Sequence, residues 1–360
     1  MALPFLNRAS KRPDQLVSID LGGRTTKAVQ LQRRGSQYIL SRYTLLDAPS
    51  HEGGLTAELL SEHLKSVCQA LETKARSLTI ALDLNDSMVR HADIPLMPIG
   101  DMRHILKTNH KAYLQQDLPD HVFDCFITVS NATAKAGAAD KTKAASPSVP
   151  KQRVLVAAAR NQMVEDVQSA VKSTGMLADS VFPGLLGPVN AFEMAMPEVF
   201  AKEAVALVDI GFRNTSICLL QEGELILSRV VGIGGDRLTA GLAEAMGISY
   251  GEAESIKVGI PGEVQSQLEA LVVPLGRELR ASMDCFEHQQ DRPITQVFIS
   301  GASAQSEIII QALRSELLVE CKTWNPLSFL QMALPPEQAS EVDSIASQLT
   351  VAVGSAMAAF

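Results

Sequence analysis

The chain has 360 residues, of which 46% are hydrophobic and 20% charged, and its formal net charge is -8 at pH 7. This length and composition predict two globular domains, and the acidic balance argues against nucleic acid as a partner. The five cysteines include no CxxC pair, which favours reduced, packed thiols over a zinc site or a disulfide framework.

Neither end of the chain predicts a membrane span. Residues 1–14 contain too short an apolar run for a signal peptide, and their basic residues follow that run instead of preceding it. Residues 345–360 are apolar but fall short of the roughly 20 residues that cross a bilayer, and they are rich in Ala, Ser and Gly. We therefore expect a closely packed terminal helix and an unexported, cytoplasmic protein.

A strand–turn–strand pattern occurs twice. Residues 18–32 (SIDLGGRTTKAVQLQ) return without a gap as residues 207–221 (LVDIGFRNTSICLLQ), at a constant offset of 189 residues, so that Asp20 matches Asp209. Solenoid repeats run about 20 to 50 residues, and this spacing is far longer. The repeat therefore predicts two domains of related fold, each of which begins with the same hairpin.

The turns of these hairpins predict a phosphate site. Successive backbone N–H groups in such a turn point toward one position, and glycines let an anion approach closely. A carboxylate beside a phosphate requires a cation between them, and Mg²⁺ is often held by carboxylates together with substrate phosphates. One such hairpin is usually only an Asx turn. Two facing copies instead predict a cleft in which Asp20 and Asp209 hold Mg²⁺ through water.

Three later segments predict further walls of this cleft. Residues 230–247 read as a strand, a Gly-Gly turn and a helix, a pattern that attracts phosphate. Residues 294–313 repeat strand, small-residue turn and helix, and this turn would admit a flat ring. Residues 250–259 place a glutamate and a lysine one helical turn apart, either as a surface ion pair or as groups that reach the ribose and the adenine edge. The residues concerned are Gly234, Gly235 and Asp236; Gly301, Ala302 and Ser303; and Glu254 and Lys257.

The segment between the hairpins predicts a compact α+β insert. Residues 131–150 are mostly Ala, Lys, Ser and Thr, which predicts a flexible loop that projects from it. We expect strands near 79–84, 87–94, 121–130 and 152–159, helices near 100–116 and 161–175, and a core stripe on the first helix from Met102, Ile105, Leu106, Ala112 and Tyr113.

In this order the elements resemble the nucleotide-binding set of the actin, DnaK-chaperone and sugar-kinase superfamily. The set comprises two Asp-x-Gly hairpins, the first with a lysine seven residues after its aspartate, then a Gly-Gly-Asp turn, a Glu-x-x-Lys pair and a Gly-Ala-Ser turn. The resemblance implies an α/β, actin-like, duplicated two-domain fold that binds ATP and Mg²⁺. The implied nucleotide-binding residues are Asp20, Gly22, Gly23, Arg24, Thr25, Thr26, Lys27, Asp209, Gly211, Asn214, Thr215, Gly234, Gly235, Asp236, Glu254, Lys257, Gly301, Ala302 and Ser303.

The insert and two later segments resemble the PilM family of type IV pilus assembly proteins. The later segments are IGGDRLT (233–239) and RELRASMDCFEHQ (277–289), and the resemblance extends over residues 14–360. The domain boundaries that it implies are 14–80, 176–205 and 338–360 for subdomain 1A, 81–175 for the FtsA/PilM-type subdomain 1C, and 206–337 for domain 2, with subdomain 2B at about 244–290.

The FtsA and GspL families share this architecture. FtsA proteins end in an amphipathic membrane-targeting helix with basic residues, whereas no Lys or Arg follows Lys322 here. GspL carries a transmembrane helix after its actin-like part, which this chain does not show. The PilM resemblance implies a cytoplasmic scaffold, peripheral at the inner membrane, that grips the N-terminal tail of a PilN-like protein between 1A and 1C. A small-molecule kinase is the alternative class, and self-association stays open.

The crossover between the domains gives little support for catalysis. Hydrolysis in this fold needs a group near the crossover that orients or deprotonates water. PilM sequences typically read VDVEAF there, whereas this chain has Ser180 and Phe182 at the two acidic positions and Asp179 beside them. We therefore expect weak or absent hydrolysis. Arg24 replaces a small hydroxyl residue in the first turn, where it either contacts phosphate or points to solvent.

Overall fold

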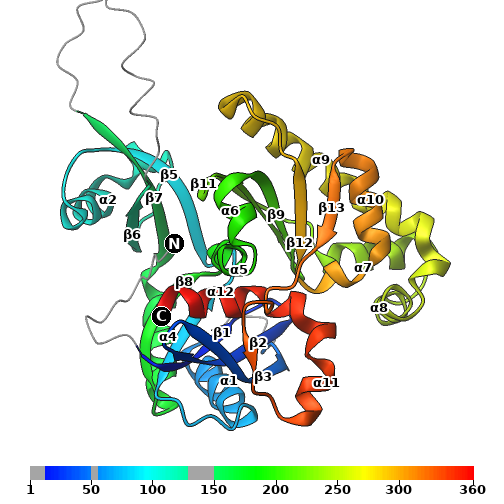
Figure 1. Ribbon diagram of the computed structural model, residues 1–360, viewed down its shortest axis with the longest axis horizontal. Coiled ribbons are helices and arrows are strands. Elements are labelled where there is room, and N and C mark those ends of the chain that lie inside the picture. Colours follow the sequence, from blue (N-terminus) through cyan, green and yellow to red (C-terminus); the bar gives the residue numbers. More distant parts are fainter. Residues whose placement is uncertain (1–12, 50–55, 129–149) are drawn as a thin grey trace, which may run out of the picture.

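Three β-sheets organise the protein (Figure 1). The computed structural model describes residues 13–49, 56–128 and 150–360. Within these ranges a six-stranded and a five-stranded sheet form two lobes, and a three-stranded sheet is attached to the first lobe. The expected loop 131–150 lies outside the described residues, apart from Pro150.

The first lobe is built on a sheet of order β14-β3-β2-β1-β4-β8. β1 pairs antiparallel with β2 and parallel with β4, so that a hairpin is followed by a crossover through α1 (Ala57–Ala70). Helices cover both faces of this sheet, and its inner strands are therefore apolar on both sides. The strands are β1 (Gln15–Asp20), β2 (Thr25–Arg34), β3 (Gln37–Asp47), β4 (Ser77–Leu82), β8 (Leu177–Pro183) and β14 (Gln331–Met332).

The second lobe repeats this topology. Its sheet has the order β11-β10-β9-β12-β13, and β9 pairs antiparallel with β10 and parallel with β12, as β1 does with β2 and β4. The predicted duplication is confirmed by this match. The strands are β9 (Ala204–Ile210), β10 (Thr215–Gln221), β11 (Glu224–Val231), β12 (Gln296–Ser300) and β13 (Glu320–Thr323).

Helices surround the second sheet and form the outer part of its lobe. α8 begins at a capping box in which Ser249 and Glu252 satisfy each other's backbone N–H groups. The 26-residue α9 buries one apolar face against the sheet and α10. The helical segments are α7 (Gly235–Met246), α8 (Tyr250–Gly259), η2 (Pro261–Val264), α9 (Gln265–Gln290), η3 (Ala302–Gln305) and α10 (Glu307–Leu317).

The insert carries the third sheet, of order β5-β7-β6. Its elements are β5 (Ser87–Pro95), α2 (Ile99–Leu114), β6 (His121–Ile127) and β7 (Lys151–Arg160). The insert also touches the second lobe, where the Ser228 hydroxyl of β11 donates to the Val89 carbonyl of β5 at 3.3 Å. α4 (Asn161–Ser173) follows β7 and packs against α1 of the first lobe.

The prediction that Ala112 belongs to the buried stripe of α2 is wrong. Met102 and Leu106 are buried as expected, but Ala112 is exposed and Leu114 is buried instead. Asn109 has non-helical angles (φ -141°, ψ 36°), so the helix kinks there and its last turn faces differently. A stripe drawn on a straight helix cannot anticipate this kink.

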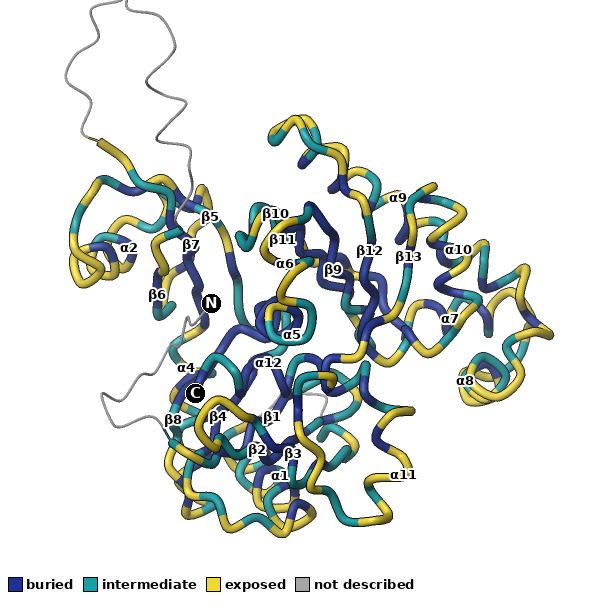
Figure 2. Tube along the Cα trace, viewed as in Figure 1, coloured by how far each residue is buried: buried dark blue, intermediate teal, exposed yellow. Residues whose placement is uncertain are grey.

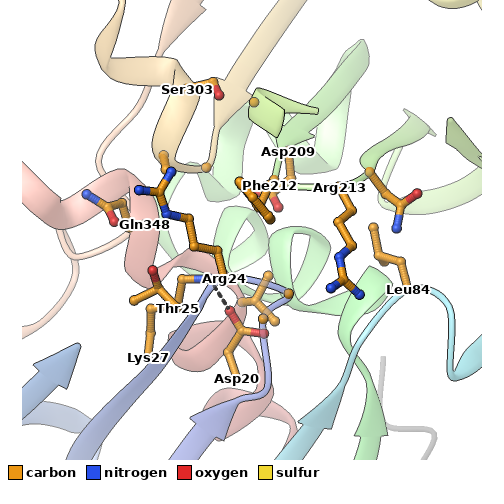
Figure 3. Close-up of a pocket in the computed structure, with 18 of the residues that line it drawn as sticks. Asp20, Arg24, Thr25, Lys27, Leu84, Asp209, Phe212, Arg213, Ser303 and Gln348 are labelled. Carbon is orange, nitrogen blue, oxygen red and sulfur yellow. Dashed lines mark hydrogen bonds and ion pairs between the residues drawn. The ribbon is translucent and has the colours of Figure 1, made fainter. Parts of the chain in front are cut away.

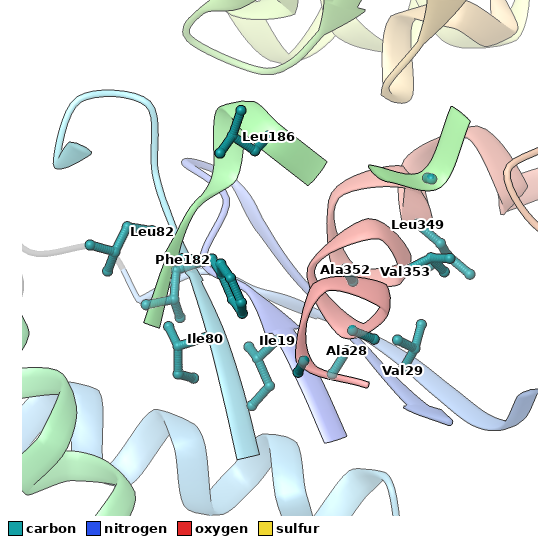
Figure 4. Packing of buried hydrophobic residues seen from close by; sticks show 14 of the residues in the cluster. Ile19, Ala28, Val29, Ile80, Leu82, Phe182, Leu186, Leu349, Ala352 and Val353 are labelled. Atoms are coloured by element: carbon teal, nitrogen blue, oxygen red, sulfur yellow. The ribbon is translucent and has the colours of Figure 1, made fainter. Parts of the chain in front are cut away.

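The chain ends in the core of the first lobe. The terminal helix α12 (Thr350–Ala359) packs on β1, β2 and β4, as Figure 4 shows for Ala352 and Val353 beside Ile19 and Ala28. The expected packed terminal helix is confirmed. The remaining helical segments are η1 (Gly184–Leu186), α5 (Gly187–Ala195), α6 (Pro197–Lys202), α11 (Pro336–Ile345) and η4 (Ala346–Leu349).

Buried residues follow the sheets of both lobes, whereas α8 and the outer face of α2 are exposed (Figure 2). In the described part of the chain, no helix is long and apolar enough to cross a membrane.

Gly354 allows α12 to lie directly on α5. A Cβ at Gly354 would overlap the Gly187 carbonyl, and a Cβ at Gly187 would stand 2.7 Å from the Val351 Cα. We expect Gly354→Ala to lower the free energy of unfolding by about 2–4 kcal/mol, because backbone must move to admit the methyl group. Urea denaturation measures this loss. Gly100→Ala is the control, since its Cβ meets open space, and an equal loss in both variants would contradict the packing argument.

Candidate functional site

A cavity of about 470 Å³ lies between the two lobes (Figure 3). Both repeated turns line it, residues 22–25 from the first hairpin and residues 211–214 from the second. Its volume is in the range of small-molecule sites. The two turns face one another across the cavity, as the repeat in the sequence predicts.

Most of the residues expected at a nucleotide lie on this cavity. They come from the β1–β2 turn, the β9–β10 turn, the start of α7, α8 and the turn after β12. Those that line it are Asp20, Gly22, Gly23, Arg24, Thr25, Lys27, Asp209, Gly211, Asn214, Gly235, Glu254, Lys257, Gly301, Ala302 and Ser303.

Four expected residues lie behind the lining. The Thr26 hydroxyl is 2.8 Å from Nε2 of His63, and the Thr215 hydroxyl donates to the Ile233 carbonyl at 2.5 Å. Asp236 accepts a hydrogen bond from the Tyr250 hydroxyl. Gly234 packs against the backbone of the second turn. These residues therefore support the shape of the turns from outside the cavity.

The first turn holds an ion pair. Asp20 and Lys27 are opposite one another in the β1–β2 register, and Nζ of Lys27 lies 3.1 Å from Oδ2 of Asp20. The turn between them is tight, since a Cβ at Gly22 would stand 2.5 Å from that Nζ and 2.6 Å from the Thr25 carbonyl. Glycine is therefore required at this position, and the lysine ammonium lies at the bottom of the cavity.

In the second turn, the aspartate stands opposite a serine instead of a lysine. Asp209 is opposite Ser216 in the β9–β10 register, and its Oδ1 accepts a hydrogen bond from the Ser300 hydroxyl at 2.7 Å. Burial raises the pKa of Asp209 to about 6, and the charge of Asp20 adds to the shift although the Ser300 hydrogen bond opposes it. The two equivalent aspartates therefore differ in electrostatic environment.

An ionic network at the other end of the cavity connects the two lobes. Oε1 of Glu254 lies 2.8 Å from Nη1 of Arg24, and its Oε2 lies 2.7 Å from Nζ of Lys257. Thr239 donates to the same carboxylate. Burial alone would raise the pKa of Glu254, but the hydrogen bonds from Lys257 and Thr239 and the charge of Arg24 lower it below its usual value. Glu254 and Lys257 are thus paired with each other and also line the cavity, so they are more than an isolated surface ion pair.

Several lining residues were not predicted. Asp83 directly follows β4, which is the parallel neighbour of β1. Because ligands bind at the carboxyl ends of parallel strands, Asp83 could have been expected at the cavity. Burial is the main cause that raises the pKa of Asp83. Arg213 matches Arg24 in the repeat, which was a usable signal. Phe212 likewise matches Gly23 in the repeat, whereas Gln348 had no such signal, because only the tertiary fold brings η4 to the cavity.

The crossover strand faces the core. Phe182 is 2% exposed and packs near Ile19 and Ile80 (Figure 4), and the buried Ser180 hydroxyl is 3.1 Å from that of Thr79. Within 177–186, a fully described segment, no carboxylate reaches the cavity. The strand itself thus offers no acid for orienting water.

The carboxylates suit a hydrated magnesium ion rather than a protein cage. Across the described ranges, no group of three or more His, Cys, Asp or Glu side chains is arranged to hold a metal ion directly. Asp20 and Asp209 both line the cavity, one from each turn. Mg²⁺ keeps several waters and usually takes one or two carboxylates together with phosphates, which this pair could provide.

Comparison with known proteins places the chain in a family. The sequence model of a family described as type IV pilus assembly protein PilM matches residues 140–360, more than half of the chain. The chain belongs to the PilM family. The duplicated lobes have the fold of the similar solved structures, and the predicted actin-like fold is confirmed.

Solved structures similar to this PilM-family chain share its fold. A chain from a PilM–PilN type IV pilus biogenesis complex superposes with a TM-score of 0.79 at 20% identity, covering 97% of this chain and 99% of that one. The ethanolamine utilization protein EutJ from Carboxydothermus hydrogenoformans gives 0.55 at 15% identity, covering 98% and 92%. The cell division protein FtsA of Bacillus subtilis (strain 168) is 35% identical over 72 residues, which are 20% of this chain and 16% of that protein.

Asp209 is expected to destabilise the ligand-free protein at neutral pH. Its raised pKa means that ionising it costs the folded state more than the unfolded state, so this cost grows as pH rises from about 4 to 6. We expect Asp209→Asn to raise the free energy of unfolding by on the order of 2 kcal/mol at pH 7.5 and to have little effect at pH 4. Urea denaturation at the two pH values tests this.

The control for Asp209→Asn is the equivalent residue of the first hairpin. Asp20→Asn removes an ion pair with Lys27, so it is expected to lower stability at pH 7.5. A loss of stability in both variants at that pH would contradict the assigned difference between the two aspartates.

Proposed function

We propose that the protein is an ATP-binding, actin-like scaffold of the inner-membrane platform that assembles type IV pili. Its fold and family support this role. The observation that carries the nucleotide site is the meeting of two repeated turns, with Asp20, Lys27 and Asp209, on one cavity between the lobes. The protein would act in the cytoplasm and reach the membrane through a partner.

The cavity walls suggest how ATP would lie. Backbone N–H groups of the two turns and the ammonium of Lys27 would bind the phosphates. Asp20 and Asp209 would hold hydrated Mg²⁺, which supplies positive charge between the carboxylates and the phosphates. The nucleoside would lie against the small turn of residues 301–303, within reach of Glu254 and Lys257.

A binding role is favoured over catalysis. The crossover strand sends no carboxylate into the cavity, since Phe182 is buried in the core and the Ser180 hydroxyl lies beside that of Thr79. A kinase would need a catalytic aspartate beside a substrate chamber. The candidates in the insert, Asp117, Asp120 and Asp124, do not line the cavity, and Asp124 is paired with Arg103 at 2.7 Å. ATP would therefore act mainly through the conformation that it stabilises.

The proposed partner is the cytoplasmic N-terminal tail of a PilN-like inner-membrane protein. Family membership supports a pilus role, and the similar fold with the higher TM-score occurs in a PilM–PilN complex. A second cavity lies within the insert, where α2 and β6 meet the start of α4, the helix that packs against α1 of the first lobe. β6 is an edge strand of its sheet, so an extended peptide could add to it. This junction is our candidate for the tail groove.

The asymmetry of the two turns gives a test of ATP binding. Lys27→Ala should weaken Mg²⁺-ATP binding by about 10- to 100-fold, because a charge-assisted contact to phosphate is lost. Ser216→Ala, at the equivalent position, should change it by less than about 3-fold. Isothermal titration calorimetry measures both, with thermal melts to check folding. Equal effects would contradict the division of roles, and a wild-type protein that binds no ATP would refute the site.

A peptide carrying the PilN tail tests the partner. It should bind the full chain by fluorescence anisotropy, and a scrambled peptide of the same composition should not. Lys107 lines the junction cavity and is exposed, so Lys107→Trp should fill the groove and weaken binding at least about 10-fold by steric exclusion. Lys111→Trp, one turn further along α2 and outside the cavity, is the control. Equal binding of tail and scrambled peptide would refute the partner.

A further inference from the structure

The arginine of each repeated turn packs against the other turn. Arg24 and Arg213 occupy equivalent positions, as do Gly23 and Phe212, at the same offset of 189 residues. The Arg24 guanidinium lies 5.3 Å from the centroid of the Phe212 ring. In return, the Arg213 side chain lies over Gly23, where a Cβ would be 3.4 Å from its Cδ. Each arginine thus packs on the residue before the other arginine.

The two arginines differ in their partners. Arg24 is bound to Glu254 at 2.8 Å and stacked on Phe212. Of the cationic side chains on the cavity, Lys27 is paired with Asp20 and Lys257 with Glu254. Arg213 makes no hydrogen bond or ion pair to any residue that the structure describes. It is therefore the cation that a ligand can engage without breaking a protein ion pair.

The two arginines also point to opposite ends of the cavity. Figure 3 shows Arg24 directed toward Gln348, on the side where the 301–303 turn and Glu254 would hold a nucleoside. Arg213 reaches toward Asp20 and Leu84, and its charge acts on the neighbouring Asp83. A nucleotide with its base at the first end would extend its phosphates toward the end that Arg213 occupies.

We propose that Arg213 binds the terminal phosphate of a nucleoside triphosphate and makes the cavity prefer a triphosphate over a diphosphate. The planar guanidinium donates two parallel N–H groups, which suits the oxygens of a phosphate. Arg24 has a different role, since Glu254 and Phe212 keep it as a clamp between the lobes. This inference rests on the proposed nucleotide site and assigns one residue within it.

Calorimetry with Mg²⁺-ATP and Mg²⁺-ADP on the full chain tests the assignment. Arg213→Ala should weaken ATP binding by about 10- to 100-fold and ADP binding by less than about 3-fold, because only ATP carries the terminal phosphate. Arg213→Lys should restore part of the preference, since it keeps the charge but loses the planar fork. Arg277→Ala, which removes an exposed arginine of α9 outside the cavity, should leave both affinities unchanged.

The outcomes separate this inference from the function on which it rests. If Arg213→Ala weakens the binding of ATP and of ADP equally, or changes neither affinity, then Arg213 does not select the terminal phosphate. The proposed nucleotide site would stand in either case. If the wild-type protein binds neither nucleotide, the proposed function fails and the inference with it. Should Arg213→Ala not fold, as thermal melts would show, Arg213→Gln, which is uncharged but keeps a polar side chain, gives the same comparison.

Discussion

The antiparallel register of the repeated hairpins is the constraint on which the site depends. The first strand of each lobe carries an aspartate at its end (Asp20) or one residue before it (Asp209), and the register fixes which residue of the returning strand stands opposite. In the first lobe this residue is Lys27, and in the second it is Ser216. A shift by one residue would turn every side chain to the other face of its sheet, so the core that holds the sheet also fixes the chemistry of the turn.

Duplication supplies two similar turns. The residues that differ between these turns give the two sides of the cavity different charges. The first turn provides a paired ammonium, whereas the second provides a half-buried aspartate whose pKa is raised mainly by burial. A cation beside Asp209 would lower the cost of ionising it, so binding of Mg²⁺ and relief of unfavourable burial favour the same state. We therefore expect ionised Asp209 to lower the stability of the ligand-free protein, and perturbed carboxylates of this kind are common at functional sites.

Local features of the chain were predictable from the sequence, and features that arise from closure of the fold were not. The hairpins, the Gly-Gly turn before α7 and the Glu254–Lys257 spacing depend on neighbours in the chain, and the sequence shows them directly. Thr26 and Thr215 were expected at phosphate because of their hydroxyl groups. In the structure, these hydroxyls are instead hydrogen-bonded to His63 and to the Ile233 carbonyl, behind the turns. Gln348 reaches the cavity from the short helix η4, far along the chain, and no local pattern could reveal it.

Asp83 joins the cavity to the insert through a very short connection. β4 ends at Leu82, Asp83 and Leu84 line the cavity, and β5 begins at Ser87. β5 is nine residues long, so it extends about 30 Å from this joint. It therefore has the proportions of a lever arm whose pivot lies beside the end of the cavity that Arg213 lines. A rotation of a few degrees at Asp83 would displace the far end of β5 by more than an ångström, so a small change beside the cavity would be enlarged at the tip of the insert.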